Sequence, residues 1–140
     1  MKLASFVHQG IRSYGIVKAD GVVDLGRRLG DRYSDLKSLL AADALNEAQQ
    51  YFGDKPDLGF DALEFLPVID NPGKILCVGM NYAEKRKEFD QHNPAPTLFI
   101  RFADSQTGHQ TPVLKPRHSR EFDYEGELAV IIGKTGEDIS

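Results

Sequence analysis

The strongest constraint on the fold of this 140-residue chain is a stretch in which alternating acidic residues lead into an apolar run. It extends from Phe122 to Gly133 and reads FDYEGELAVIIG. In a strand, alternate side chains share a face, so Asp123, Glu125 and Glu127 would point the same way, about 6.6 Å apart along the strand. The run from Leu128 to Ile132 has no polar face, which is typical of a strand buried on both sides. The stretch therefore predicts a core strand with carboxylates at its entrance.

Carboxylates in that position need compensation, because like charges near a low-dielectric core repel one another and lose hydration. A bound divalent cation is one solution, and oxygen ligands alone suit Mg²⁺, Mn²⁺ or Ca²⁺ better than zinc. In the alternative interpretation the acidic half lies outside the core, with its carboxylates in water and no ligand bound. The strand pattern alone leaves both interpretations open.

Composition and charge exclude several classes of function. Apolar residues at 41% and charged residues at 27% are ordinary for a soluble globular protein. A net charge of -4 argues against nucleic acid or an anionic membrane as the main partner, because both require a basic surface. No apolar run approaches the roughly 20 residues of a membrane span, and the first residues contain no signal-peptide core. With a single cysteine, Cys77, we predict a cytoplasmic protein that acts on small molecules or contacts other proteins.

A dense turn signal, Asp70-Asn71-Pro72-Gly73, divides the chain, and we place a domain boundary there. The predicted domains are a small N-terminal domain at residues 1–70 and a second domain at residues 71–140. No internal repeat or low-complexity segment is visible in either.

The first domain is expected to begin with an antiparallel meander, because apolar runs at residues 3–8, 11–18 and 22–25 alternate with glycine-containing turns. Asp35 is expected to cap a helix with apolar residues at helical spacing that continues through Phe52. Asp43 is a second candidate cap, so one helix or two remains open.

The second domain is expected to contain two strands and a helix before the acidic stretch. The strands are predicted at residues 74–79 and 97–102, and a short charged helix at residues 83–89. The charges of that helix are most simply a solvated face. Arg101 lies inside an apolar run, so its side chain must reach water or pair with an anion.

From Lys74 to Lys134 the sequence resembles the fumarylacetoacetate hydrolase family. The segment Lys74–Tyr82 is similar to the family's opening strand and Asn-Tyr turn, Leu98–Arg101 to its next strand, and Asp123–Lys134 to its signature. The first seventy residues are more weakly similar to the small N-terminal domain of many members. The resemblance implies an α+β, mostly β, fold class: a small N-terminal α/β meander domain plus the first strands of a β-rich catalytic fold.

The resemblance also implies a metal site and a class of substrate. Glu125 and Glu127 would bind Mg²⁺ or Mn²⁺, or Ca²⁺, and Asp123 would support them. Members act on 2-oxo or β-diketo acids, which the metal chelates and polarises as a Lewis acid. They cleave a C–C bond through an enolate that the metal stabilises, as in aromatic catabolism, or they decarboxylate, isomerise or eliminate. A homodimer is implied for the full-length protein.

One position departs from the pattern of the hydrolytic members. These use a histidine shortly after the Asn-Tyr turn, paired with a glutamate three residues later; here Lys85 stands at the histidine position and Glu88 at the glutamate position. A lysine is a poor base unless burial or another cation lowers its pKa. Decarboxylation, isomerisation or another lyase reaction is therefore left more open, with Lys85 and Glu88 as catalytic candidates. Arg101 is expected to hold a substrate carboxylate, and Tyr82 to line the pocket or simply to pack at the turn.

A second departure concerns the family's third carboxylate ligand, an aspartate that follows the signature. The given sequence stops at Ser140, before that position. We therefore expect the N-terminal portion of a longer enzyme, which on its own binds metal weakly. The competing hypotheses are a non-catalytic binding or assembly module that has lost the site, and an acidic strand that is only a solvated edge.

Overall fold

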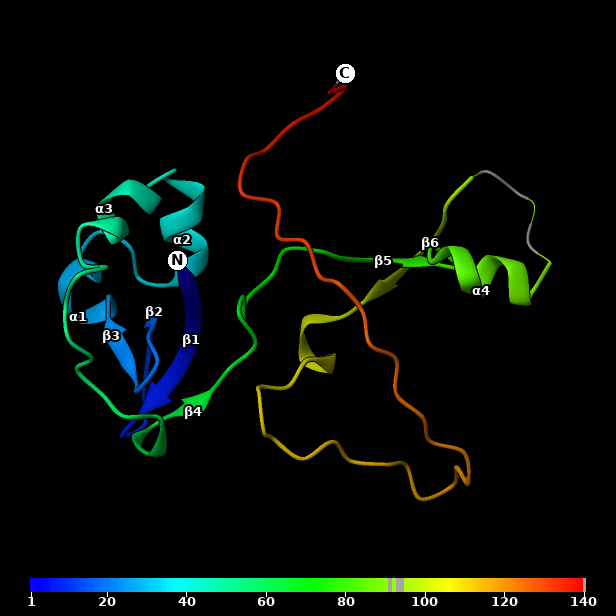
Figure 1. Cartoon of the computed structure of the whole chain (residues 1–140), viewed down its shortest axis with the longest axis horizontal. Coiled ribbons are helices and arrows are strands. Elements are labelled where there is room, and N and C mark those ends of the chain that lie inside the picture. Colours follow the sequence, from blue (N-terminus) through cyan, green and yellow to red (C-terminus); the bar gives the residue numbers. More distant parts are fainter. Residues whose placement is uncertain (91, 93–94, 140) are drawn as a thin grey trace. The chain divides into compact units, whose positions relative to one another are not determined.

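A computed structural model describes residues 1–90, 92 and 95–139 and shows a mixed α+β architecture of short helices and antiparallel sheets (Figure 1). It divides into two compact units, one of Met1–Ile69 with Thr107–Ser140 and the other of Asp70–Gln106. We describe each unit by itself. The domains expected at residues 1–70 and 71–140 stay a prediction.

The first unit is built on a four-stranded antiparallel sheet in the order β3-β2-β1-β4. Its strands are β1 (Lys2–His8), β2 (Ile11–Val17), β3 (Val22–Asp24) and β4 (Glu64–Phe65). The predicted meander is thus confirmed. Tight turns connect its strands, and in the second of them the Lys18 amide donates to the Gly21 carbonyl at 2.8 Å.

Three short helices follow the meander: α1 (Gly26–Leu29), α2 (Leu36–Ala41) and α3 (Leu45–Gln49). The predicted cap of α2 is confirmed as a capping box, in which the Ser38 amide donates to Asp35 Oδ1 at 2.7 Å and the Asp35 amide donates to Ser38 Oγ at 3.1 Å. The chain forms two helices rather than one, because Asp43 adopts a left-handed φ of 54° between them. The four-residue α1 was not predicted, since it is too short to show a helical period.

The core of this unit lies between the sheet and the helices. One side chain in it, Tyr14, is fully buried, and its hydroxyl donates to the Tyr33 carbonyl at 2.8 Å. Burial, with the nearby charges of Asp35 and Asp24, raises the pKa of Tyr14 to about 12. The cluster of buried residues comprises Tyr14, Ile16, Val23, Leu25, Leu29, Leu36, Leu39, Ala44 and Ala48.

A polar network joins the end of β3 to the segment that leads from α3 toward β4. The buried Asp24 accepts from Ser13 Oγ at 2.5 Å, and its amide donates to Asp57 Oδ2 at 2.8 Å. Arg28 donates to the same Asp57 oxygen at 2.6 Å and to Asp54 at 3.2 Å. The Arg28 hydrogen bond lowers the pKa of Asp57 below its ordinary range.

The second unit is a hairpin with one helix and a 3₁₀ turn. It contains β5 (Ile75–Gly79), α4 (Ala83–Glu88), β6 (Thr97–Arg101) and a 3₁₀ turn at Ala103–Ser105. The two predicted strands and the predicted helix are confirmed. None of the described residues of this unit is buried.

The core strand predicted at residues 122–133 is wrong for this chain. Residues 121–133 have no regular secondary structure, and the apolar run is exposed, with Leu128 at 83%, Val130 at 76% and Ile132 at 80% of full accessibility (Figure 1, orange to red). A strand needs a partner for its backbone hydrogen bonds, and no described strand pairs with this stretch. Among the described helices, none has the length and apolar character to cross a membrane.

Candidate functional site

The structure brings together the two residues predicted to be catalytic. Lys85 Nζ lies 3.2 Å from Glu88 Oε2, because residues three apart are neighbours on one side of α4. The same ammonium lies 5.3 Å from the centroid of the Phe89 ring. Both members of the pair are accessible, with 48% of the Lys85 side chain and 61% of the Glu88 side chain exposed. The site at α4 is therefore a surface ion pair.

Tyr82 lies at the start of the same helix. It is the N-cap residue of α4, and its carbonyl accepts a hydrogen bond from the Arg86 amide at 3.1 Å. The residue remains half-exposed at 49%. Its position at the turn is compatible with either predicted role, lining a pocket or packing locally.

Arg101 lies at the opposite end of the hairpin from α4. It pairs with Ile75 at the start of β5, whereas α4 follows Gly79, which pairs with Thr97. Four strand residues correspond to about 14 Å along β6. The Arg101 guanidinium stacks on the Phe99 ring, 4.8 Å from its centroid. The register of the hairpin therefore separates Arg101 from the turn at which Tyr82 stands.

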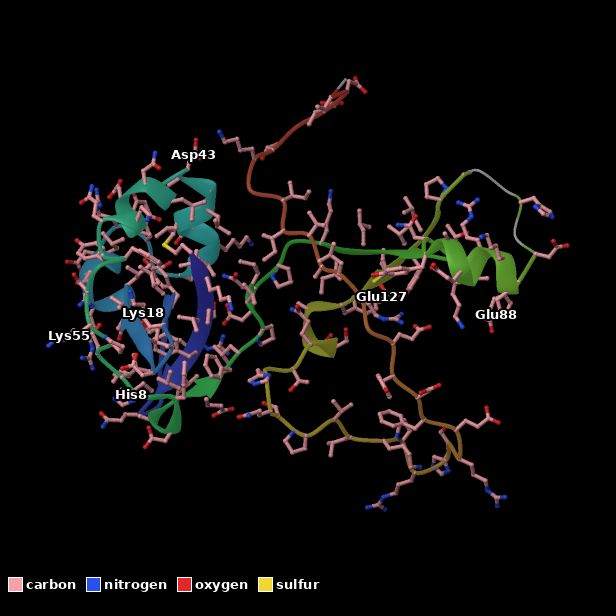
Figure 2. All side chains as sticks on the ribbon, in the orientation of Figure 1. His8, Lys18, Asp43, Lys55, Glu88 and Glu127 are labelled. Carbon is pink, nitrogen blue, oxygen red and sulfur yellow. The ribbon has the colours of Figure 1, made fainter. Side chains whose placement is uncertain are left out.

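The predicted metal ligands lie on the acidic stretch, with which no described strand pairs. Glu125 and Glu127 are exposed, as is Asp123, whose Oδ1 accepts from the Tyr124 amide at 2.8 Å (Glu127 is labelled in Figure 2). Two carboxylates are the donors that hard divalent cations prefer. However, the part of the chain that the structure describes contains no group of three His, Cys, Asp or Glu side chains able to hold a metal ion. The residues present do not make a complete metal site.

An open cleft of about 530 Å³ occurs in the first unit. The rings of Phe60 and Phe65 lie in its wall with centroids 6.1 Å apart, and His109 meets the Phe65 ring edge-on at 5.9 Å. None of the predicted site residues lines it.

Comparison with known proteins decides the family. Residues 74–140 match the model of the fumarylacetoacetate (FAA) hydrolase C-terminal domain. The chain belongs to the fumarylacetoacetate hydrolase family. The predicted resemblance is thus confirmed, and the matched region of this family member contains all six predicted site residues.

Relatives within this family include oxaloacetate tautomerases. Human oxaloacetate tautomerase FAHD2B, mitochondrial, is 42% identical over 85 residues, which are 60% of this chain and 27% of that protein. The Xenopus laevis oxaloacetate tautomerase fahd2, mitochondrial, is 42% identical over 78 residues, 55% of this chain and 24% of that protein. An uncharacterized protein of Staphylococcus epidermidis is 30% identical over an alignment of 162 positions, 99% of this chain and 53% of that protein. The chain thus spans about a quarter of the tautomerases and about half of the staphylococcal protein.

The roles of the six site residues stay predictions. The match places them inside the family's domain, while the structure shows one pair, Lys85 and Glu88, in direct contact. The sequence analysis named Lys85 and Glu88 from the family resemblance and did not predict their contact, which their separation of three residues on one helix explains. The place of Arg101 depends on the register of the hairpin, which residue spacing does not reveal.

Proposed function

We propose that this protein supplies part of a divalent-metal-dependent site that acts on 2-oxo acids, and that its reaction is the interconversion of the keto and enol forms of an oxaloacetate-like dicarboxylate. The observation that carries the proposal is the Lys85–Glu88 ion pair at 3.2 Å. It occupies the positions at which hydrolytic members have a histidine and a glutamate. The printed activity of the tautomerase relatives supports the same reaction class.

The ion pair suits proton transfer better than water activation. In hydrolytic members the histidine of the pair takes a proton from water, and a lysine ammonium at that position has no acceptor atom for this role. Tautomerisation removes one proton from the carbon next to the carbonyl and places one proton on the carbonyl oxygen. In the proposed reaction the Glu88 carboxylate accepts the carbon-bound proton, and the Lys85 ammonium transfers one of its protons to the carbonyl oxygen, which gives the enol. The proton on Glu88 then passes to the Lys85 amine across their contact, which restores both groups.

Cleavage of a C–C bond in 2-oxo or β-diketo acids also leads to an enolate. The same pair therefore remains compatible with a hydrolase or lyase reaction of the family, in which a C–C bond breaks in place of the C–H bond. The lysine in place of a histidine favours the tautomerase, because that reaction needs no activated water.

The metal is proposed to be Mg²⁺, Mn²⁺ or Ca²⁺, with Glu125 and Glu127 as two of its ligands. Because the described residues assemble no third ligand, the remaining donors must come from elsewhere. When bound, such an ion polarises the substrate carbonyl as a Lewis acid. Arg101 is proposed to bind a substrate carboxylate through its guanidinium, and Tyr82 to line the substrate site.

Calorimetric titration of the 140-residue chain with Mg²⁺ and Mn²⁺, with and without oxalate, tests the metal site. We expect weak binding that oxalate strengthens and that the Glu125→Gln/Glu127→Gln variant loses. Glu137→Gln, an exposed carboxylate outside the alternating run, is the matched control and should leave binding unchanged. Equal titrations for the chain and the double variant would refute the metal assignment. A non-catalytic assembly module predicts instead that neither ion changes the thermal melt.

The reaction itself is tested by following the ultraviolet absorbance of enol oxaloacetate. Lys85→Gln and Glu88→Gln should each slow the enzyme-dependent decay by at least about tenfold, as expected for loss of an acid–base group. Lys87→Gln, which removes a neighbouring charge of the same helix, should have little effect. An unchanged rate in the Lys85 and Glu88 variants would exclude this pair as the proton-transfer machinery.

A further inference from the structure

A short basic segment lies directly before the acidic stretch and has no role in the proposed reaction or metal site. It is Lys115–Arg120, with cations at Lys115, Arg117 and Arg120, and we refer to it as the basic turn. In a chain with a net charge of -4, three cations in six residues form a local positive patch. Such a patch attracts anions.

Hydrogen bonds within the basic turn hold it together, and the Lys115 side chain donates two of them. Lys115 Nζ donates to the Ser119 carbonyl at 2.5 Å and to the Pro116 carbonyl at 3.2 Å. The Ser119 amide also donates to the Pro116 carbonyl, at 3.3 Å, and Ser119 Oγ donates to the Glu121 carbonyl at 2.5 Å. Lys115 is therefore occupied with backbone carbonyls.

The two arginines of the basic turn differ from Lys115. Arg117 and Arg120 are exposed, and within residues 1–90, 92 and 95–139 neither guanidinium takes part in an ion pair. By contrast, Arg28 is committed to Asp57 and Asp54. The turn thus presents two planar donor groups to solvent.

An anionic substrate needs these charges, because the neighbouring run repels it. Carboxylates occur at every second position from Glu121 to Glu127, and a divalent cation compensates only two of the four negative charges. In an extended chain the Cα atoms of Arg120 and Asp123 lie about 10 Å apart. That distance is about one Debye length at 0.1 M salt, so the arginines act on an anion that approaches the acidic run.

We propose that Arg117 and Arg120 capture a carboxylate of the anionic substrate in front of the Glu125 and Glu127 carboxylates. A guanidinium binds a carboxylate through two parallel hydrogen bonds, which a lysine ammonium cannot do. The inference rests on the proposed function, since it takes a 2-oxo dicarboxylate as the ligand. It assigns the turn a role in substrate selection, favouring dianions over neutral compounds, and predicts that capture weakens as salt is added.

Nuclear magnetic resonance of the ¹⁵N-labelled full chain tests the proposal with oxalate as the probe and no metal present. We expect the side-chain Nε–Hε signals of Arg117 and Arg120 to shift saturably, and to shift less at high salt. Arg117→Gln/Arg120→Gln should raise the apparent Kd for oxalate about 3- to 10-fold, as expected for two exposed ion pairs. Arg12→Gln/Lys37→Gln removes the same charge at two exposed positions, in β2 and α2, and should not change it. Retained dispersion of the amide signals from the buried residues between Ala4 and Ala48 reports that each variant folds.

The outcomes separate this proposal from the function on which it rests. Equal shifts for all exposed arginines, or equal weakening by both double variants, would show a nonspecific charge effect and overturn the capture site. Oxalate binding that depends on Glu125 and Glu127 with Mg²⁺ but ignores the arginines would also overturn it, while supporting the metal site. Saturable arginine shifts with no Mg²⁺ response at Glu125 and Glu127 would support anion capture and count against the metal assignment.

Discussion

Arg28 links helix α1 to the segment after α3, because its guanidinium bonds to two aspartates of that segment. Its Nη1 lies 2.6 Å from Asp57 Oδ2, and both side chains are largely shielded, with 22% and 23% exposed. The contact links residues 29 positions apart. Sequence periodicity predicted the local cap at Asp35 but could not reveal this pair, since nothing in spacing reports such a long-range contact.

Replacing Arg28 should therefore destabilise the first unit. Arg28→Gln leaves the Asp57 carboxylate without its charged donor, and we expect a loss of about 1–3 kcal/mol in the free energy of unfolding. Lys2→Gln, an exposed cation at the chain end, is the control and should change stability by less than about 0.5 kcal/mol. Urea unfolding followed by circular dichroism measures both. A loss no larger than that of the control would mean that the pair contributes little.

The same pair gives stability a dependence on acid. The pKa of Asp57 in the folded chain is lowered, first by the Arg28 hydrogen bond. Its contribution is therefore fully present above the unfolded pKa of about 4 and is lost as pH falls through the lower folded pKa. In urea titrations below about pH 4, we expect Asp57→Asn to reduce the loss of unfolding free energy with falling pH, while Asp31→Asn, which replaces an exposed aspartate, should leave that loss unchanged. An equal loss in both variants would contradict the assignment.

Tyr14 is expected to make the stability of the first unit fall at alkaline pH. Burial raises its pKa from 10.0 to about 12, so its neutral form contributes stability below about pH 10 that is lost as pH rises toward 12. Tyr14→Phe removes the ionisable hydroxyl and its bond to the Tyr33 carbonyl. We expect it to cost about 1 kcal/mol at neutral pH and to reduce the alkaline destabilisation. Thermal melts between pH 8 and about 12 measure both effects, and an unchanged alkaline slope would exclude Tyr14 as its source.

At the scale of elements, the sequence pattern predicted the positions of strands well. The β1–β2 pair was foreseen as part of a meander, whereas β5 and β6 were foreseen only as separate strands, and the structure pairs both. The same reasoning failed for residues 122–133, although they include five consecutive apolar residues, Leu128 to Ile132. Apolar character indicates that a segment will be buried if a partner exists, but it does not supply the partner. The shared face of the carboxylates is absent with it, since alternation places carboxylates side by side only in a formed strand; the metal ligands themselves stay a prediction.

The turn at Gly21 illustrates a constraint that only the packed element reveals. A Cβ at this position would overlap the Leu58 carbonyl oxygen, which accepts the Val22 amide hydrogen bond at 2.8 Å. We expect Gly21→Ala to separate these backbones and to cost about 1–3 kcal/mol. Gly53→Ala adds the same methyl where nothing lies within 4 Å and should be nearly neutral. Equal unfolding midpoints in urea for the two variants would show that the β3 contact tolerates the methyl group.

At the scale of the whole molecule, burial is distributed very unevenly. Every buried residue among those described lies between Ala4 and Ala48, whereas the region that matches the family, residues 74–140, contains none. A two-stranded hairpin without a core is marginal in water. The sequence could assign this region to its family because short motifs carry that information. It could not show how the region would pack, because packing requires partner surfaces that these motifs do not include.

Hydrogen exchange should reveal this asymmetry directly. We expect slow amide exchange in β1, β2 and β3, and exchange close to that of an unstructured peptide for residues 122–133, because no strand of the described residues pairs with them. The β1–β2 peptides serve as the internal control. Slow exchange of residues 122–133 at high dilution would contradict this expectation. Protection that grows with protein concentration would instead show that the exposed apolar run associates with another copy, as a large apolar surface in water favours.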